Sequence, residues 1–378
     1  MTSGLKLDES KTKLMTFSEM PSFLAFVLNS VMKLANSSSK ERLLILLSAK
    51  IGRLISNKKM NFSMTRLYLA GLAFIFLSSC SNNNFIDEIS GPTMGTSYSI
   101  KSTKRINQEE ITEELERINQ IFSNWVSDSE INRFNHTNVN QPFSPSKEFQ
   151  EVFEISKKIH LETGGYFDPG INDLINNLGF GEKPAKKINS VDDLKKLANH
   201  STIASIDLKS NQLVKRDEVQ VNFSAIAKGY AVDLLADLLI SNGHQNFLIE
   251  IGGEVFAQGK KNSDPWKIGI QSPENHQSLS IPIHNEGVAT SGNYLNFTLV
   301  DHQKVGHILN PKTGISENNH LFSVSVIHPK VAIADAYATA LMAMPIDEAK
   351  RLILKEKLKV VFIVKQNKAY KVEKINFQ

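Results

Sequence analysis

VNFSAIAKGYAVDLLADLLISNGHQNFLIEIGGEVFAQG, residues 221–259, contains the end of one strand, a tight turn, a helix and a second strand. Apolar residues recur at helical spacing from Ile226 onward, so we expect a helix with Ser224 as its N-cap. Gly243 has the position of a C-terminal glycine. Phe247–Ile251 is then expected to be a strand. The stretch therefore predicts a strand–helix–strand unit around which the rest of the chain is arranged.

Two features of this stretch exceed what packing alone requires. Lys228 lies in the first helical turn, where the helix dipole opposes a cation but where a phosphate is readily bound. The pair Gly252-Gly253 lets the backbone approach another group closely. An ordinary strand–helix–strand unit with a solvated lysine explains the same residues, so the stretch alone leaves both interpretations open.

The composition is that of a globular protein, and 378 residues are enough for one large domain or two. The net charge of +4 arises near the N-terminus, because residues 1–79 hold 11 of the 43 basic residues but 4 of the 39 acidic ones. The remaining residues are slightly acidic, which argues against a nucleic-acid partner. Cys80 is the single cysteine, so a disulfide within the chain is excluded.

The N-terminal part of the chain divides into two predicted segments. Residues 1–59 carry no motif and form an unassigned extension, which one interpretation places upstream of a true start at Met60 or Met64. Residues 60–80 are predicted to be a lipoprotein signal peptide. Their apolar run of 11 residues, 67–77, is too short to span a bilayer comfortably and suits a signal sequence.

The apolar run ends in Leu77-Ser78-Ser79-Cys80, which resembles a bacterial lipobox. We therefore predict that Cys80 is lipidated and that the polar residues 81–89 form a tether. The alternative is a buried core helix with an incidental cysteine. A lipidated Cys80 implies export to the bacterial cell envelope, with the protein anchored by its lipid and facing the periplasm. The sequence does not distinguish the inner from the outer membrane.

Residues 90–378 are expected to be the folded part, beginning with a turn at residues 91–96. Polar residues 183–199 are interpreted as a surface excursion, and residues 288–294 as a loop. Apolar spacing predicts helices at Ile111–Phe122, Val152–Thr163, Ala332–Met344 and Asp347–Glu356. It predicts further strands at Ser97–Ile100, Trp266–Gln271, Phe322–His328, Val360–Val364 and Ala369–Val372.

Seven motifs follow one another along this part of the chain. They are GPTMGT, FSNWVSDSEINRFN, TGGYFDPGINDLINNLGFG, NFSAIAKGYAVD with IEIGGEVFAQG, VATSGNY, GHILNPKTG and IADAYATA. In this order they resemble the bacterial flavin transferase family known as ApbE, from about Gly91 to about Met344. The resemblance implies an α+β fold, in which a single domain combines mixed, largely antiparallel sheets with flanking helices.

The resemblance also implies a reaction. Family members bind FAD with Mg²⁺ and transfer FMN through its phosphate to a threonine or serine hydroxyl of a target protein, while AMP leaves. Such phosphoryl transfer needs a divalent cation, backbone close to the phosphates and a base for the attacking hydroxyl. The acceptors in this family are typically subunits of membrane redox complexes.

The family's metal ligands and base can be carried over residue by residue. Asp335 and Thr339 are separated by four residues and so share one face of the predicted helix. Their oxygen atoms suit Mg²⁺, and the resemblance adds the backbone carbonyl of Ala225 as a third ligand. His307 corresponds to the family's histidine before the proline turn, where a neutral imidazole accepts the hydroxyl proton. A buried hydrogen bond between Asp335 and Thr339, or a structural histidine, is the alternative.

The flavin contacts of the family map onto residues from several motifs. They are Met94, Trp125, Tyr166, Phe167, Asp168, Asn222, Lys228 and Leu309. Thr290 and Ser291 are expected to donate to phosphate oxygens, or simply to cap a turn. Core packing is the alternative for the aromatic residues.

The chain departs from the family at two positions, Asn222 and Asn310, where the family usually has aspartate. Asparagine still forms hydrogen bonds but brings no charge, so metal affinity is expected to change at Asn222.

Two other functions remain open from the sequence. One is a Mg²⁺-dependent FAD pyrophosphatase, in which water attacks in place of a protein hydroxyl and yields FMN and AMP. The other is a lipoprotein that binds FAD without catalysing a reaction. The acceptor protein and the oligomeric state are not encoded in any motif.

Overall fold

The computed structural model describes residues 85–185, 188, 190–200, 202–271, 278–292, 297–317, 320–366 and 369–377. The predictions for residues 1–59, for the signal peptide 60–80 and for Cys80 lie outside the described residues. In the described part of the chain, no helix has both the length and the apolar character needed to cross a bilayer.

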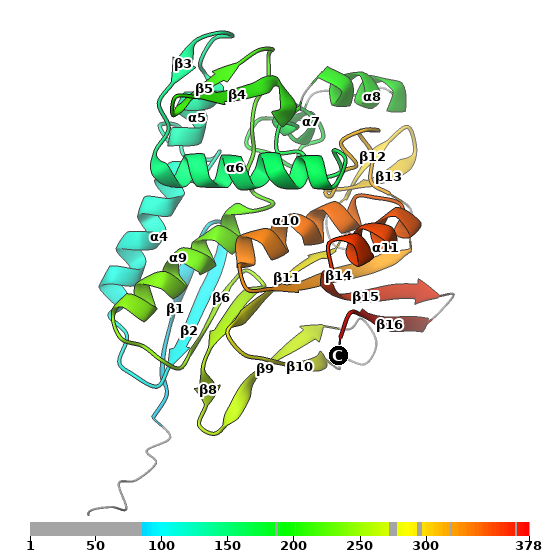
Figure 1. The fold of residues 1–378 in the computed structure, drawn as a ribbon. Coiled ribbons are helices and arrows are strands. Elements are labelled where there is room, and N and C mark those ends of the chain that lie inside the picture. The colour runs from blue at the N-terminus through cyan, green and yellow to red at the C-terminus, as the bar shows by residue number, and fades with distance from the viewer. Residues whose placement is uncertain are drawn as a thin grey trace, which may run out of the picture. The chain divides into compact units, whose positions relative to one another are not determined.

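An eight-stranded sheet forms the centre of the fold, and every neighbouring pair of its strands is antiparallel (Figure 1). The strands in spatial order are β1 (Asp87–Thr93), β2 (Thr96–Ser102), β6 (Phe247–Ile251), β7 (Glu254–Gln258), β11 (Glu286–Gly292), β14 (Leu321–His328), β15 (Lys359–Gln366) and β16 (Ala369–Ile375). Together with the helices below, this sheet confirms the α+β fold and its largely antiparallel pairing.

Helices cover one face of this sheet. α9 (Ala227–Ser241) packs on β6 and β7, and α10 (Val331–Met342) packs on β11 and β14 (Figure 1). Around them lie α4 (Gln108–Phe122), α6 (Lys147–Glu162) and α11 (Ile346–Lys355). α10 contacts α6, α9 and α11 and is buried on nearly all sides, which its alanine-rich sequence permits.

A small sheet covers part of the opposite face of the main sheet. It consists of β8 (Lys260–Lys261), β9 (Asp264–Gln271) and β10 (Ser278–Ile283). Trp266 and Ile268 of β9 pack on Val288 and Ile327 of the main sheet. The neighbouring strands β14 and β15 are therefore buried on both faces along most of their length. In β15 this matches a continuous apolar run, Val360–Val364, whereas β14 alternates the buried Ser323 and Ser325 with valines.

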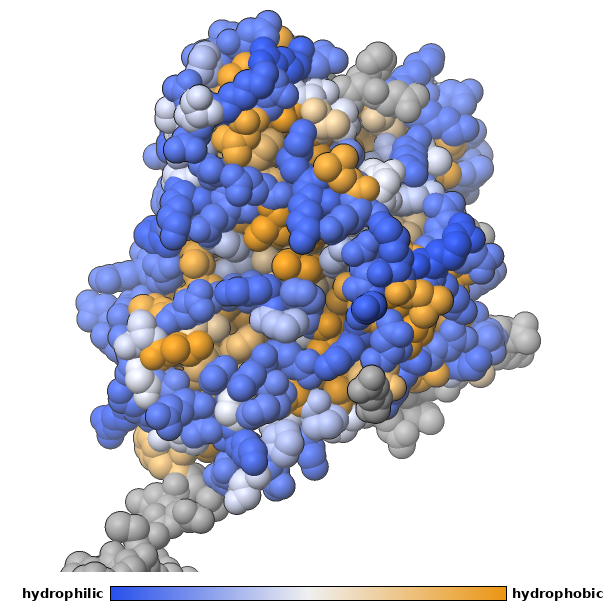
Figure 2. Space-filling model, in the orientation of Figure 1, coloured by the Kyte–Doolittle hydropathy of each residue, from blue (hydrophilic) through white to orange (hydrophobic). Residues whose placement is uncertain are grey.

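The remaining elements form a layer beyond α6 (Figure 1). They are α5 (Glu130–Asn135), α7 (Asn172–Asn177), α8 (Val191–His200), the 3₁₀ turn η2 (Ile203–Ser205), the sheet of β3 (Pro142–Phe143), β5 (Gln212–Lys215) and β4 (Ile206–Lys209), and the hairpin of β12 (Phe297–Val300) and β13 (Gln303–Gly306). Figure 2 shows that charged and polar side chains cover most of the face in view, with apolar groups scattered between them.

Five local predictions were wrong, the first two because tertiary contacts override the local pattern. Residues 288–294 were expected to be a loop, but the part that the structure describes belongs to β11, which pairs with β7 and β14. The surface excursion at 183–199 includes α8, whose Leu194 is fully buried against α7 and β13. The turn at 91–96 is confined to Met94 and Gly95, which have positive φ angles of 48° and 73°. β1 begins at Asp87, inside the expected tether.

The fifth wrong prediction is the N-cap of α9. Ser224 makes no capping hydrogen bond, and the cap position is Ile226. The side chain of Asn222 instead accepts from the N–H of Ser224 at 2.9 Å, which forms the turn before the helix. Gly243 does follow the helix, with a φ of 77° and its N–H donating to Ile240.

Candidate functional site

A cavity of about 440 Å³ lies where the first turn of α9, the middle of α10 and β11 meet the segments 166–171 and 307–311. The predicted site residues that line it are Tyr166, Phe167, Asp168, Asn222, Ala225, Lys228, Thr290, Ser291, His307, Leu309, Asp335 and Thr339. Apolar side chains such as Ile171 and Ile175 complete the wall. Residues from five of the seven motifs therefore meet at one cavity.

Two predicted flavin contacts are not part of this lining. Met94 lies in the β1–β2 turn and is packed against the main core. Trp125 exposes 74 % of its surface on the loop between α4 and α5. That loop is held by Asn124, whose amide donates to the carbonyl of Val221 at 3.2 Å, next to the cavity residue Asn222. The structure therefore places Trp125 near the organising stretch but not in the cavity wall.

The close packing of α9 against α10 positions the predicted metal ligands. A Cβ atom on Gly229 would lie 2.5 Å from the carbonyl oxygen of Val331, so only glycine permits this distance between the helices. The N–H of Gly229 donates to Oδ2 of Asp335 at 3.1 Å. Asp233 of α9 caps α10, because its two carboxylate oxygens accept from the N–H groups of Val331 at 2.9 Å and Ala332 at 3.0 Å.

Asp335 and Thr339 lie one turn apart on α10, as their spacing predicted. Asp335 is buried. The hydroxyl of Thr339 lies 3.2 Å from the hydroxyl of Ser291 on β11, and the hydroxyl of Thr290 lies 2.7 Å from that of Ser325 on β14. The cavity thus has a row of hydroxyl groups beside one carboxylate.

Glu254, the first residue of β7, is a lining residue that the sequence analysis missed. Its Oε1 lies 2.7 Å from Nζ of Lys228, and the residue exposes 2 % of its surface. Its Oε2 is buried and has no hydrogen-bond partner among the described residues. The available signal was the position of Glu254 directly after Gly252-Gly253, on the same face of the strand as the buried Phe256.

Lys228, Glu254 and Asp335 form a cluster of two buried carboxylates and one partly exposed ammonium group. Burial raises the pKa of Asp335 and of Glu254, and the nearby ammonium group only partly offsets this. Burial also opposes the charged form of Lys228, but the two carboxylates outweigh it and raise the pKa of Lys228. The two carboxylate shifts therefore come chiefly from burial, and the Lys228 shift comes from the two carboxylates beside it.

These residues fit a hard divalent cation. A surplus carboxylate charge and an unpartnered buried oxygen are what such an ion compensates, and oxygen atoms are the ligands that Mg²⁺ prefers. The carboxylate of Asp335, the hydroxyl of Thr339 and the carbonyl of Ala225 all line the cavity. The described residues contain no group of three or more His, Cys, Asp and Glu side chains that could hold a metal ion, so a cation here would need hydroxyl and carbonyl oxygens as well.

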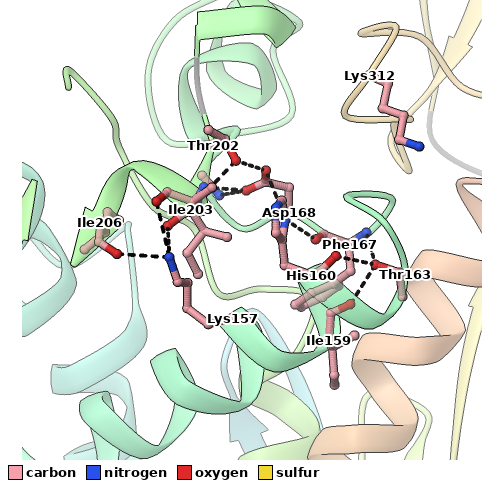
Figure 3. Close-up of polar contacts among 12 residues, drawn as sticks. Lys157, Ile159, His160, Thr163, Phe167, Asp168, Thr202, Ile203, Ile206 and Lys312 are labelled. Carbon is pink, nitrogen blue, oxygen red and sulfur yellow. Dashed lines mark hydrogen bonds and ion pairs between the residues drawn. The ribbon is translucent and has the colours of Figure 1, made fainter. Parts of the chain in front are cut away.

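Asp168 is held by four contacts within the protein (Figure 3). Its Oδ1 accepts from the N–H groups of Gly170 and Ile203, each at 2.8 Å. Its Oδ2 accepts from the hydroxyl of Thr202 at 2.6 Å and lies 3.3 Å from Nδ1 of His160. The carboxylate of Asp168 therefore stabilises the loop 166–171 that lines the cavity, in addition to any contact with a nucleotide.

The segment 202–206 is held against the loop 166–171 by a close backbone contact and by hydrogen bonds from Lys157. A Cβ atom on Gly170 would lie 2.4 Å from the nitrogen of Ile203, so glycine is required where the two backbones meet. The ammonium group of Lys157 donates to the carbonyls of Ile203, Ala204 and Ile206 at 3.1–3.3 Å (Figure 3). These contacts rigidify the floor of the cavity.

Two aromatic residues enter the cavity wall from the end of α6. The hydroxyl of Thr163 accepts from the N–H of Phe167 at 3.1 Å, which orients the segment after the helix. The Lys312 ammonium lies 3.8 Å from the centre of the Tyr166 ring. Burial, reinforced by the carboxylates of Glu348 and Glu317, raises the pKa of Tyr166 to about 12, so its hydroxyl stays protonated at neutral pH.

Asn222 and Asn310, where the resemblance led us to expect aspartate, both have clear partners. Asn222 donates to Oδ1 of Asn172 at 3.0 Å. Asn310 donates to Oε1 of Glu317 at 2.6 Å and accepts from the N–H of Lys312 at 2.9 Å, so it caps the proline turn. An aspartate at 310 would place two carboxylates together, and asparagine avoids this repulsion.

His307 directly follows β13 and lines the cavity, as its motif predicted. Its ring centre lies 6.3 Å from that of Phe180, at an edge-to-face angle of 70°. The imidazole is thereby placed in the same cavity as the carboxylate of Asp335 and the hydroxyl of Thr339.

Comparison with known proteins adds independent information to this geometry. The model of the ApbE family matches residues 94–362. The chain belongs to the ApbE family. It is 33 % identical over 320 residues to an FAD:protein FMN transferase of Vibrio cholerae, which covers 81 % of the chain and 96 % of the relative. An FAD:protein FMN transferase of Escherichia coli is 29 % identical over 335 residues, or 82 % of the chain and 95 % of the relative.

Solved structures of ApbE proteins share the fold. The flavin transferase ApbE from Vibrio cholerae superposes with a TM-score of 0.70 at 32 % identity, covering 77 % of this chain and 97 % of that one. The apo form of the flavinyl transferase ApbE from Pseudomonas stutzeri has a TM-score of 0.71 at 28 % identity, covering 77 % and 94 %. The predicted family and the single ApbE-like domain are both confirmed.

Proposed function

We propose that this protein transfers FMN from FAD to a threonine or serine hydroxyl of an acceptor protein, in a Mg²⁺-dependent reaction that releases AMP. The observation that carries the proposal is the meeting of His307, Asp335 and Thr339 at one cavity together with an ammonium group and hydroxyl groups. The curated relatives described above have the same named activity, FAD:protein FMN transfer.

Different residues of the cavity have different roles in this reaction. His307 takes the proton from the acceptor hydroxyl as its oxygen attacks the phosphorus of the FMN moiety, and the bond between that phosphorus and the AMP oxygen breaks. Lys228, Thr290 and Ser291 face the diphosphate with positive charge and hydroxyl groups. The apolar wall with Tyr166 and Phe167 suits flat aromatic rings.

Asp335, Thr339 and the carbonyl of Ala225 would hold Mg²⁺. When bound, the ion supplies charge neutralisation at the phosphate oxygens. Glu254 and Asp335 leave a surplus negative charge in the cluster, which supports a divalent cation there.

The test combines the purified protein with FAD, Mg²⁺ and membranes from cells that lack the gene. Covalent flavin fluorescence on a protein band in a denaturing gel, with release of AMP, is the expected result. AMP with free FMN and no labelled band would identify a pyrophosphatase instead. Unchanged FAD would identify a flavin carrier and would refute the proposed transfer. The labelled band also identifies the acceptor, which we propose to be a subunit of a membrane redox complex.

We also propose that Cys80 is lipidated and that the protein faces the periplasm from its membrane anchor. The apolar run 67–77 and the following Leu77-Ser78-Ser79-Cys80 support this location. An FMN transferase held at the membrane surface would be close to membrane-bound acceptors.

A further inference from the structure

We propose that Glu254 is a positioning residue for Lys228, which it holds toward the diphosphate in the cavity. This inference rests on the proposed function. Glu254 begins β7 and Lys228 lies in the first turn of α9, so the pair connects the sheet to the helix that carries the cavity's cation. The two charged atoms are 2.7 Å apart.

The ammonium group of Lys228 needs such a partner. It lies at the N-terminal end of α9, where the helix dipole repels a cation. Its side chain still exposes 28 % of its surface, whereas that of Glu254 exposes 2 %. A flexible lysine side chain has many rotamers, and a buried carboxylate at this distance selects one of them. Both residues line the cavity, but the buried carboxylate is the fixed member of the pair and the ammonium group is the more exposed one.

The second oxygen of Glu254 also indicates a ligand-directed role. A structural ion pair is stable when both oxygens are satisfied, but Oε2 is buried with no hydrogen-bond partner among the described residues. Such an orphan oxygen is costly for stability alone. A fixed ammonium group of Lys228 beside the reacting phosphate is the gain that offsets this cost.

The experiment is a double-mutant cycle of Glu254→Gln and Lys228→Met, measured as turnover of FAD. Glu254→Gln should lower kcat by roughly 10- to 100-fold, the scale of a misplaced catalytic contact, while KM for FAD changes less than about threefold. In the Lys228→Met background, Glu254→Gln should have no further effect, because Glu254 acts through Lys228. Equal and additive losses in both backgrounds would overturn the proposal.

A simple electrostatic role would give a different result. If Glu254 only repels the diphosphate, neutralising it should tighten FAD binding and leave kcat unchanged, which would also overturn the proposal.

The matched control is Glu286→Gln, which breaks an ion pair with Lys359 at 2.9 Å in the same sheet but outside this cavity. It should leave both kcat and KM unchanged.

A readout without turnover separates this inference from the proposed function. Lysines are reductively methylated with ¹³C, and the Lys228 resonance is assigned by its loss in Lys228→Arg. In the otherwise unsubstituted protein this resonance should be shifted from the common lysine position, and Glu254→Gln should return it to that position. An identical resonance in both proteins would refute the positioning. If FAD does not react at all, the proposed function fails, and the resonance still decides whether Glu254 holds Lys228.

Discussion

At the scale of single residues, Asp335 and His307 have different expected roles although they line the same cavity. Asp335 is buried and belongs to the cluster with two carboxylates, so its removal would take away the charged ligand of the proposed metal ion. In the proposed reaction His307 is the proton acceptor, a role that hydroxide in solution can partly replace. The two substitutions should therefore respond differently to metal and to pH.

Asp335→Ala should abolish FMN transfer at ordinary Mg²⁺ concentrations, because loss of charge neutralisation costs several kcal/mol of transition-state stabilisation, to order of magnitude. His307→Ala should reduce the rate on the order of 10²–10⁴-fold and should be partly rescued at high pH. Transfer rates measured against pH and Mg²⁺ for both variants test this. Full transfer activity in Asp335→Ala would rule out Asp335 as a ligand of the proposed metal ion.

Asp233 should make stability depend on pH. Burial raises the pKa of Asp233 to about 6, although the N–H groups of Val331 and Ala332 favour its ionised form. Since the folded pKa is raised above the ordinary value of about 3.9, the stabilising contribution is complete below that value and is lost as pH rises through about 6. Asp233→Asn removes this titration.

The free energy of unfolding of the wild type, minus that of Asp233→Asn, should therefore fall between about pH 4 and about pH 7, by up to about 3 kcal/mol. Urea denaturation of both proteins at half-unit pH steps measures the difference. Two parallel stability curves would show that Asp233 does not titrate in this range.

At the scale of elements, the site depends on how closely α9 approaches α10. Gly229 makes this approach possible, because its hydrogen stands where any side chain would meet the backbone of Val331. Asp233, further along α9, caps the start of α10, and the N–H of Gly229 binds Asp335. One helix therefore both positions and orients the other.

Gly229→Ala should destabilise the protein by about 1–3 kcal/mol, because the added Cβ would lie 2.5 Å from a backbone oxygen that cannot move alone. This sign is opposite to the usual effect of Gly→Ala in a helix interior, a gain of roughly 0.5–1 kcal/mol. The midpoint temperature of thermal unfolding and the rate of FAD turnover should both fall. Ser241→Ala at the exposed end of the same helix is the control and should change neither by much. Stabilisation by Gly229→Ala would contradict the packing argument.

At the scale of the whole molecule, the predictions concern parts of the chain outside the described residues. Cys80→Ser should give an unlipidated protein that leaves the membrane fraction or keeps its signal peptide, because a single thiol would carry the anchor. Membrane fractionation and the mass of the mature N-terminus test this. The same fraction and the same mass in variant and wild type would disprove the lipobox.

Deleting residues 1–59 should leave export and activity intact, because Arg66, the apolar run and the whole ApbE domain remain. Cell fractionation and FMN transfer by the shortened protein measure both outcomes. Failure of the mature domain to fold in this variant would show that the extension is more than an upstream segment.

The sequence by itself determined the family, the helices α4, α6, α9, α10 and α11, and the spacing of Asp335 and Thr339 along one helix face. These features depend on residues that are close together in the chain, where apolar period and motif order are sufficient. Only the tertiary structure revealed Glu254 beside Lys228, the cap that Asp233 gives to α10, and β11 in place of a loop. Each of these joins residues of different elements, and the free energy that decides them comes from packing and charge across elements, which no local pattern records.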